Sequence, residues 1–142
     1  MEKSVEFSIA KITTEQFAVI DDYYFPEKEV ALVGEFRFAL IQKDKVISAF
    51  SQFRFQQSDK PFLVIEVGCH FKMKEDSWDQ FKNDDKMVIE KGFMVHLLTI
   101  AVGTTRGVLH TKTESSRFNQ YLLPTINLTD TVKEDFTVDL TP

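Results

Sequence analysis

The sequence predicts an α+β domain in which strands come first and helices follow. Four segments in the first half alternate apolar and polar residues, the period of a strand with one buried face. The second half holds a stretch without proline, residues 86–114, which is long enough for a helix. Strands followed by helices are typical of the α+β class. The chain has 142 residues, the size of one domain, so we expect residues 1–142 to form a single domain.

The first strand is predicted from Val5, Phe7 and Ile9, which alternate with polar residues. Ile12 falls out of phase with these three side chains. One extra residue in a strand shifts the phase in this way, so we expect a β-bulge near residues 10–11.

Three further strands are predicted at residues 30–41, 46–56 and 62–73. One face of the first of them carries Val30, Leu32, Phe36, Phe38 and Leu40, and the other face carries Glu35 and Arg37. The gaps at residues 43–45 and 58–61 have the length and composition of tight turns. Short turns join antiparallel neighbours, so we expect an antiparallel sheet.

The region from residue 75 to 114 is predicted as an acidic loop to residue 85, and mostly helix thereafter. Residues 93–102 are nearly all apolar and include β-branched side chains, so a buried strand is the alternative there, although the length favours a helix. Gly103 and Gly107 lie one helical turn apart and would let another backbone approach closely. We therefore expect a packed helical interface at these glycines.

The last part of the chain is broken at Pro124, which disturbs a helix interior. Thr129 and Asp130 could cap a short C-terminal helix through Phe136. Acidic residues late in that segment oppose the helix dipole and weaken the prediction.

Composition excludes several classes of function. The formal net charge is −5 and no long basic block is present, which argues against nucleic acid and anionic membranes as partners. The single cysteine, Cys69, allows no internal disulfide. The N-terminus lacks a signal-peptide pattern, and no run approaches the roughly 18 apolar residues typical of a membrane helix. We expect a cytoplasmic protein that does not insert into membranes.

Three segments resemble the SecB family of protein-export chaperones. Residues 7–12 read FSIAKI, similar to the family's opening strand, and residues 61–67 read PFLVIEV, similar to its Phe-Leu-x-x-Glu-Val strand. Residues 105–128 begin with the family's small-Arg pair and end in RFNQYLLPTINL, similar to its leucine-rich segment before Pro-[Ile/Val]-Asn-Phe. Residues 69–71 and 101–104 depart from the family pattern, as expected for a distant member.

The resemblance implies a four-stranded antiparallel sheet with a long helix and a short C-terminal helix packed on one face. It implies dimers that form through the first strand and the long helix, and that pair into a tetramer. We place Phe7, Ile9, Gly103 and Gly107 at this oligomer interface. The family holds unfolded precursor proteins and delivers them to an export translocase motor, with no cofactor, no metal and no catalytic residue.

Candidate client-binding residues are the apolar and aromatic side chains of two segments, residues 17–26, which read as a loop, and residues 121–136. They are Phe17, Tyr23, Tyr24, Phe25, Tyr121, Leu122, Leu123, Ile126, Leu128, Val132 and Phe136. Aromatic rings provide large contact areas with few rotatable bonds, and apolar contacts tolerate clients of different sequence. The alternative is that both segments, like most of the 14 phenylalanines, simply close the core.

Other chemistry is not indicated by the residue pattern. Cys69 and His70 are adjacent in a strand, so their side chains point to opposite faces and do not converge. His96 and His110 would lie roughly 20 Å apart along a helix, too far to share a metal. Three hypotheses remain: a SecB-like holdase, a dedicated chaperone of one protein, for example of a toxin–antitoxin pair, and an enzyme or small-ligand binder.

Overall fold

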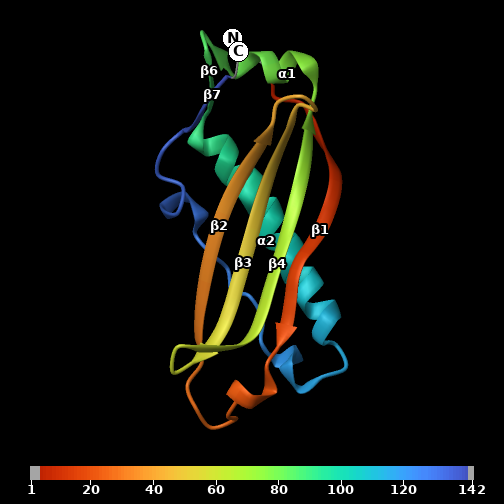
Figure 1. Ribbon diagram of the computed structural model, residues 1–142, viewed down its shortest axis with the longest axis vertical. Helices are drawn as coiled ribbons and strands as arrows, with labels where there is room; N and C mark the ends of the chain where they lie inside the picture. Colours follow the sequence, from red (N-terminus) through yellow and green to blue (C-terminus); the bar gives the residue numbers. More distant parts are fainter. Residues whose placement is uncertain (1–3, 141–142) are drawn as a thin grey trace.

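A four-stranded antiparallel sheet dominates the structure, a computed structural model that describes residues 4–140 (Figure 1). Its strands are β1 (Phe7–Val19), β2 (Ala31–Ile41), β3 (Val46–Gln57) and β4 (Lys60–Met73). They are arranged in the order β1-β4-β3-β2, and every neighbouring pair is antiparallel. The predicted antiparallel sheet is therefore confirmed.

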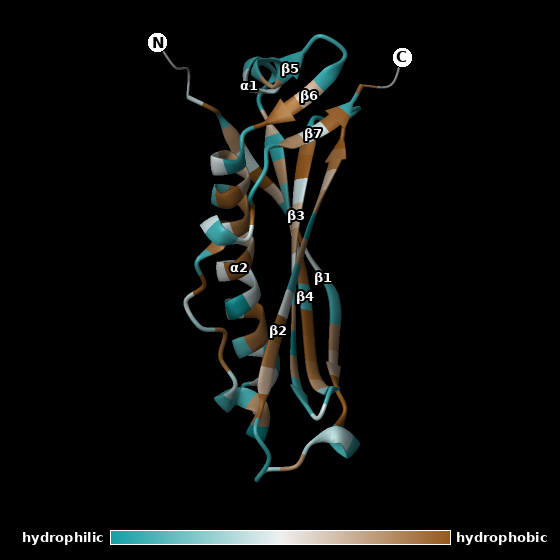
Figure 2. Cartoon of the chain, turned by 90° about the vertical axis from the view of Figure 1, so that its left-hand side faces the viewer, coloured by the Kyte–Doolittle hydropathy of each residue, from teal (hydrophilic) through white to brown (hydrophobic). Residues whose placement is uncertain are grey.

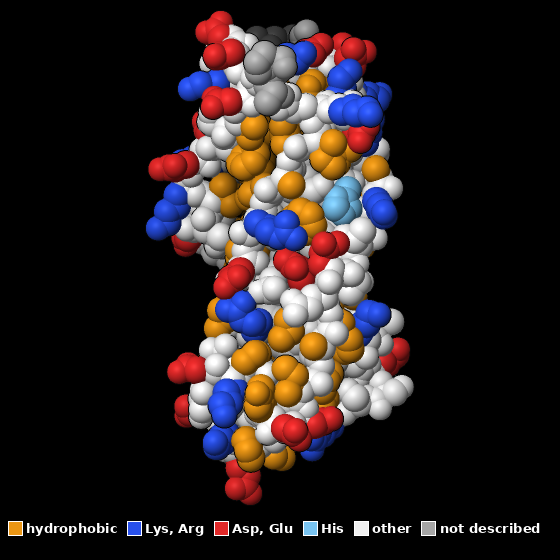
Figure 3. Space-filling view, viewed as in Figure 1, with side chains coloured by type: hydrophobic (Ala, Val, Ile, Leu, Met, Phe, Trp, Pro, Cys, Tyr) orange, Lys and Arg blue, Asp and Glu red, His pale blue; other side chains and the backbone are white. Residues whose placement is uncertain are grey.

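The two faces of the sheet follow the predicted alternation. In β3, Ile47, Ala49, Phe53 and Phe55 are buried on the face that carries the long helix. Among residues 4–140, no helix covers the opposite face (Figure 2). Figure 3 shows that this outer face carries charged side chains across its middle, with apolar side chains above and below them.

Strand β1 is longer and more irregular than its neighbours. Its pairing with β4 shifts register between Ile9 and Lys11, which confirms the predicted bulge, and shifts again between Thr14 and Gln16. Phe17 pairs with Ile65 inside the strand, so the predicted loop at residues 17–26 begins only after Val19.

The long helix α2 (Lys91–Thr113) crosses one face of the sheet and packs mainly on β3 and β4 (Figure 1). Its buried residues recur at helical spacing: Met94, Leu97, Leu98, Ala101, Val102, Thr105, Leu109 and Thr113. By length and composition alone α2 could cross a membrane, which the sequence analysis did not anticipate, and a core helix passes the same test. The predicted helix over residues 93–102 is confirmed, and the strand alternative is wrong.

A second, small sheet stands where the start of the long helix and the C-terminal helix were predicted. It consists of β5 (Lys82–Asn83), β6 (Lys86–Ile89) and β7 (Phe136–Asp139) in that order. The helix therefore begins only at Lys91, because Met87 and Ile89 are buried as alternating residues of β6. The predicted acidic loop contains a short helix, α1 (Glu75–Gln80), which buries Trp78.

The predicted C-terminal helix is not formed. Only a 3-10 turn, η3 (Leu128–Asp130), occurs there, and Phe136 begins β7 instead of ending a helix. The alternation of Phe136 and Val138 with polar residues suits pairing with β6. The Asp135 carboxylate accepts a hydrogen bond from the backbone N–H of Lys91 at 2.9 Å, so this acid caps α2.

Candidate functional site

An aromatic cluster lies at the end of the sheet where β1 leads into the 3-10 turn η1 (Asp21–Tyr23). The ring of Tyr24 lies 4.8 Å from that of Phe62 and 5.0 Å from that of Phe118. The hydroxyl groups of Tyr121 and Tyr24 form a hydrogen bond of 2.8 Å. Ring contacts and this hydrogen bond therefore join segments that are far apart in the sequence.

The side chain of Gln57, at the end of β3, holds the loop that follows this cluster. Its Oε1 accepts the N–H of Phe25 at 2.8 Å, and its Nε2 donates to the carbonyl of Phe25 at 2.9 Å and of Lys28 at 3.2 Å. Gln57 is buried, and all three partners are backbone groups. The backbone of Phe25 is therefore fixed, although its ring is exposed. Nothing in the sequence pattern marked Gln57, because its partners lie about thirty residues away.

The pKa of Tyr121 is raised to about 12, first by burial and then by the hydrogen bond to Tyr24. The nearby positive charge of Arg117 opposes this shift. Tyr121 is therefore neutral at physiological pH. Its role is to hold the cluster together, not to act as an acid or a base.

Two arginines attach the segment after α2 to the rest of the domain. The guanidinium of Arg117 lies over Tyr24, 4.7 Å from the ring centroid, and pairs with Asp21 at 3.1 Å. Arg106, in α2, donates from Nε to the carbonyl of Leu123 at 3.0 Å and from a terminal nitrogen to that of Pro124 at 2.8 Å. The chain after the helix is thus held against α2 by charge-assisted hydrogen bonds.

The structure separates the predicted client-binding residues into three groups. Three are exposed: Tyr23, Phe25 and Leu122, at 38%, 49% and 58%. Five are half-buried: Phe17, Tyr121, Ile126, Val132 and Phe136. Three are buried: Tyr24, Leu123 and Leu128. For these last three the core alternative is correct, since they pack against other residues of the domain.

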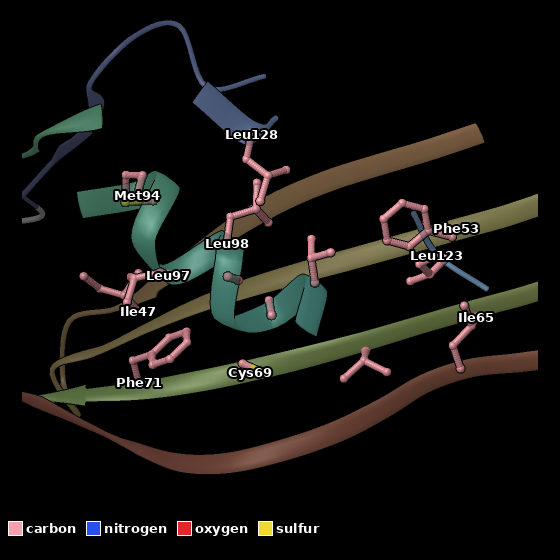
Figure 4. Close-up of a cluster of buried hydrophobic side chains, with 14 of the residues drawn as sticks. Ile47, Phe53, Ile65, Cys69, Phe71, Met94, Leu97, Leu98, Leu123 and Leu128 are labelled. Atoms are coloured by element: carbon pink, nitrogen blue, oxygen red, sulfur yellow. The ribbon is translucent and has the colours of Figure 1, made fainter. Parts of the chain in front are cut away.

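Leu123 and Leu128 point into the space between α2 and the sheet (Figure 4). Figure 4 shows Leu128 beside Leu98 and Leu123 beside Phe53. Apolar burial between helix and sheet is the ordinary way in which such a segment closes a core. A client could contact these two side chains only if the segment moved away from α2.

The predicted residues do not form one continuous surface. Tyr23 and Phe25 follow β1 at one end of the sheet, whereas Phe136 contacts Phe38 toward the opposite end, with ring centroids 5.9 Å apart (Figure 1). Val132, with Val95, lines a separate shallow pocket of about 520 Å³ beside the start of α2. Among the predicted residues, Tyr23, Phe25 and Leu122 are the exposed ones near the aromatic cluster, and we call these three residues the aromatic tip.

Lysine side chains lie against the rings of this region. The Lys60 ammonium is 5.3 Å from the centroid of Tyr23, and that of Lys28 is 4.5 Å from the centroid of Phe25. These cation–π contacts leave apolar rings edged by positive charge. The contact between Tyr23 and Lys60 could not be predicted from the sequence, because the two residues come together only through the pairing of the strands.

A second exposed apolar surface lies on β1 and the outer side of α2. Ile9 and Ile12 are 48% and 51% exposed on β1. A Cβ atom added to Gly103 or Gly107 would meet no atom within 4 Å, so both positions face open space in the single chain. Phe7 differs, because its ring packs 5.4 Å from that of Phe93 and belongs partly to the core.

This second surface carries little charge. Between Lys91 and Lys112 the only charged residue of α2 is Arg106, and its guanidinium binds the carbonyls after the helix. The solvent side of a helix in a monomer normally carries several charged residues. Ile12 was not predicted as an interface residue, although the sequence already showed that it is out of phase with Val5, Phe7 and Ile9.

Cys69 and His70 point to opposite faces, as predicted. The Cys69 thiol is buried beneath α2, and burial raises its pKa. His70 lies on the outer face between two hydroxyl groups, 2.7 Å from Ser48 Oγ and 2.9 Å from Thr13 Oγ1. Among residues 4–140, no three His, Cys, Asp or Glu side chains are placed to hold a metal ion.

Comparison of the sequence with protein-family models and with curated proteins finds no match. The resemblance in residues 7–12, 61–67 and 105–128 therefore remains a resemblance between short segments.

Proposed function

We propose that this protein is a SecB-like holdase that binds unfolded or precursor polypeptides in the cytoplasm. It acts without a cofactor, a nucleotide or catalysis. The observation that carries the proposal is the aromatic tip, in which two aromatic rings and one leucine are exposed next to a rigid cluster. Apolar contacts of this kind need no particular client sequence.

Two other features support this proposal. The sheet and the long helix agree with the arrangement that the resemblance to SecB implies, although fold alone does not fix function. A net charge of −5 favours solubility in a protein that exposes apolar surface. Delivery of the client to an export translocase motor is part of the proposal, as the function of the family implies.

We further propose that the working form is a homo-oligomer. The contact surface between two copies consists of Ile9, Gly103 and Gly107, together with Ile12. Phe7 packs beneath this surface. Dimers formed in this way pair into a tetramer. The exposure of the two isoleucines and the nearly uncharged outer side of α2 support this contact.

The proposal is tested by the aggregation of a chemically unfolded, unrelated client at near-equimolar ratio and without nucleotide. Wild-type protein is expected to suppress aggregation, and the double variant Tyr23→Ala with Phe25→Ala to suppress it less while unfolding cooperatively. Ile41→Ala is the matched control, since this side chain is similarly exposed at the opposite end of the sheet. Equal suppression by both variants would contradict the aromatic tip as the client site.

A second candidate is a dedicated chaperone of one specific protein, such as a component of a toxin–antitoxin pair. The lysines at the rings of Tyr23 and Phe25 favour it, because charged groups held beside apolar rings restrict which partners fit. This candidate predicts weak suppression of generic aggregation, together with tight capture of a single protein. A folded wild-type protein that fails to protect any unrelated client would favour it over the general holdase.

A further inference from the structure

The free edge at β2 is built differently from the free edge at β1. The strand order places β1 and β2 at the two edges of the sheet. Edge strands are usually protected from pairing by bulges, prolines or charges. β1 has two register shifts, whereas β2 pairs with β3 through eleven consecutive residues without any shift. β2 contains no proline, and only Glu35 and Arg37 are charged.

Strand β2 is also incompletely covered. None of its residues is buried, whereas most residues of β3 and β4 are. On the side that faces α2, Leu32, Phe36, Phe38 and Leu40 are only partly buried. In the described part of the chain no strand pairs with the outer edge of β2, so its outward N–H and C=O groups are free to pair.

The sequence of β2 is complementary to itself when it is read in reverse about Phe36. An antiparallel pair of β2 strands with a two-fold axis at Phe36 places Glu35 of each copy opposite Arg37 of the other. The same register places Leu32 opposite Leu40, and Val33 opposite Ala39. Residues directly opposite each other in antiparallel strands share one face of the sheet, so charge meets opposite charge and apolar meets apolar.

Neighbouring symmetric registers lack this match. A two-fold axis at Glu35 places the two Glu35 carboxylates opposite each other, and an axis at Arg37 places the two guanidinium groups opposite each other. Like charges directly opposite each other destabilise a strand pair. The positions of the two charged residues therefore specify one register.

The charges behind β2 extend the match. Within one chain, Glu35 pairs with Arg54 at 3.0 Å, and Arg37 lies 3.5 Å from Glu66. Across the proposed seam, Glu35 would lie between Arg54 of its own chain and Arg37 of the second copy, and that Arg37 would also lie near Glu66 of the second copy. Positive and negative charges therefore alternate along this series of contacts.

We propose that two copies of this chain join edge to edge through β2, about a two-fold axis at Phe36, into one continuous sheet. The contact is isologous, with the same surface used on both copies. It lies on the opposite edge of the sheet from the proposed contact at β1 and α2 and does not depend on the holdase function. Contacts at both edges would join more than two chains.

Charge reversal combined with mixing tests the contact. Glu35→Arg alone places Arg opposite Arg37, and Arg37→Glu alone places Glu opposite Glu35, so each variant should halve the mass of the wild-type assembly in sedimentation. An equimolar mixture of the two variants restores both opposite-charge pairs and should restore the wild-type mass. Glu27→Arg, the same charge change at an exposed residue outside β2, should leave the mass unchanged.

Three outcomes would overturn the proposal: a wild-type mass of one chain, an unchanged mass in both single variants, or a mixture that stays dissociated. An unchanged mass with loss of client protection in Glu35→Arg would instead assign the β2 edge to clients. If a charge variant fails to fold, Phe36→Cys in a Cys69→Ala background replaces it and should form a disulfide-linked dimer. Ala31→Cys should not, because its two copies would lie about 34 Å apart. No cross-link at residue 36 also overturns the proposal.

Discussion

Replacing Gln57 by alanine should loosen the loop that carries Phe25 and leave the rest of the sheet intact. Three hydrogen bonds to backbone groups are lost: those to the N–H and the carbonyl of Phe25 and to the carbonyl of Lys28. Each bond contributes about 1 kcal/mol net, and the freed loop regains some contact with water, so we expect a loss of about 2 kcal/mol. At about 2.1 cal/mol/K per residue, the unfolding entropy of this chain converts that loss into a melting temperature lower by about 7 °C.

The assay is thermal and urea unfolding of Gln57→Ala beside Gln56→Ala. Gln56 is the neighbouring residue of β3 and faces the other side of the sheet, half-buried, so its replacement should change stability by no more than about 0.5 kcal/mol. Amide hydrogen exchange should show faster exchange at Phe25 in the Gln57 variant alone. Equal melting temperatures for the two variants would refute the reasoning that Gln57 fixes this loop.

Three further predictions follow from the same contacts. In the folded wild-type protein the pKa of Tyr121 is raised to about 12, so as the pH rises the tyrosine ionises first in the unfolded chain and the wild-type protein loses stability between about pH 10 and pH 12. Tyr121→Phe should remove this loss, and a urea midpoint that depends on pH as in the wild type would contradict the prediction. Gly107→Leu should leave the secondary structure seen by circular dichroism unchanged, since its side chain meets open space, but should lower the mass in sedimentation; an unchanged mass counts against the α2 contact. The Cys69 thiol, buried and with a raised pKa, should react with a disulfide reagent only in urea, and rapid reaction in the native protein would show that the core opens.

The parts of the fold that could be predicted are those fixed by local patterns. The strands of the large sheet follow from alternation over adjacent residues, and the pairing of β2, β3 and β4 follows from two short turns. The bulge after Ile9 was visible because a change of phase is itself a local signal. The outward faces of Glu35 and Arg37 followed from the same alternation.

The parts that could not be predicted depend on partners distant in sequence. β6 pairs with β7, which is nearly fifty residues further on. Each strand has only four residues, and alternation over four residues is too short to distinguish a strand from the predicted helices. Tyr24 and Phe25 are adjacent in an aromatic run, yet one is buried and the other exposed. The difference arises from Phe62, Phe118 and the side chain of Gln57, which approach this run only in the folded chain.

The proposals about assembly rest on two surfaces that a monomer would normally protect. A helix with one charged residue between its terminal lysines and a long edge strand without a bulge both favour association. On β2, the two charged residues lie where a two-fold axis at Phe36 places opposite charges next to each other. Two residues of like charge at these positions would oppose pairing in every register near the centre of the strand. One Glu and one Arg instead leave a single register favourable, which is not expected of charges that serve only to prevent association. The mass of the wild-type protein therefore bears on both surfaces at once.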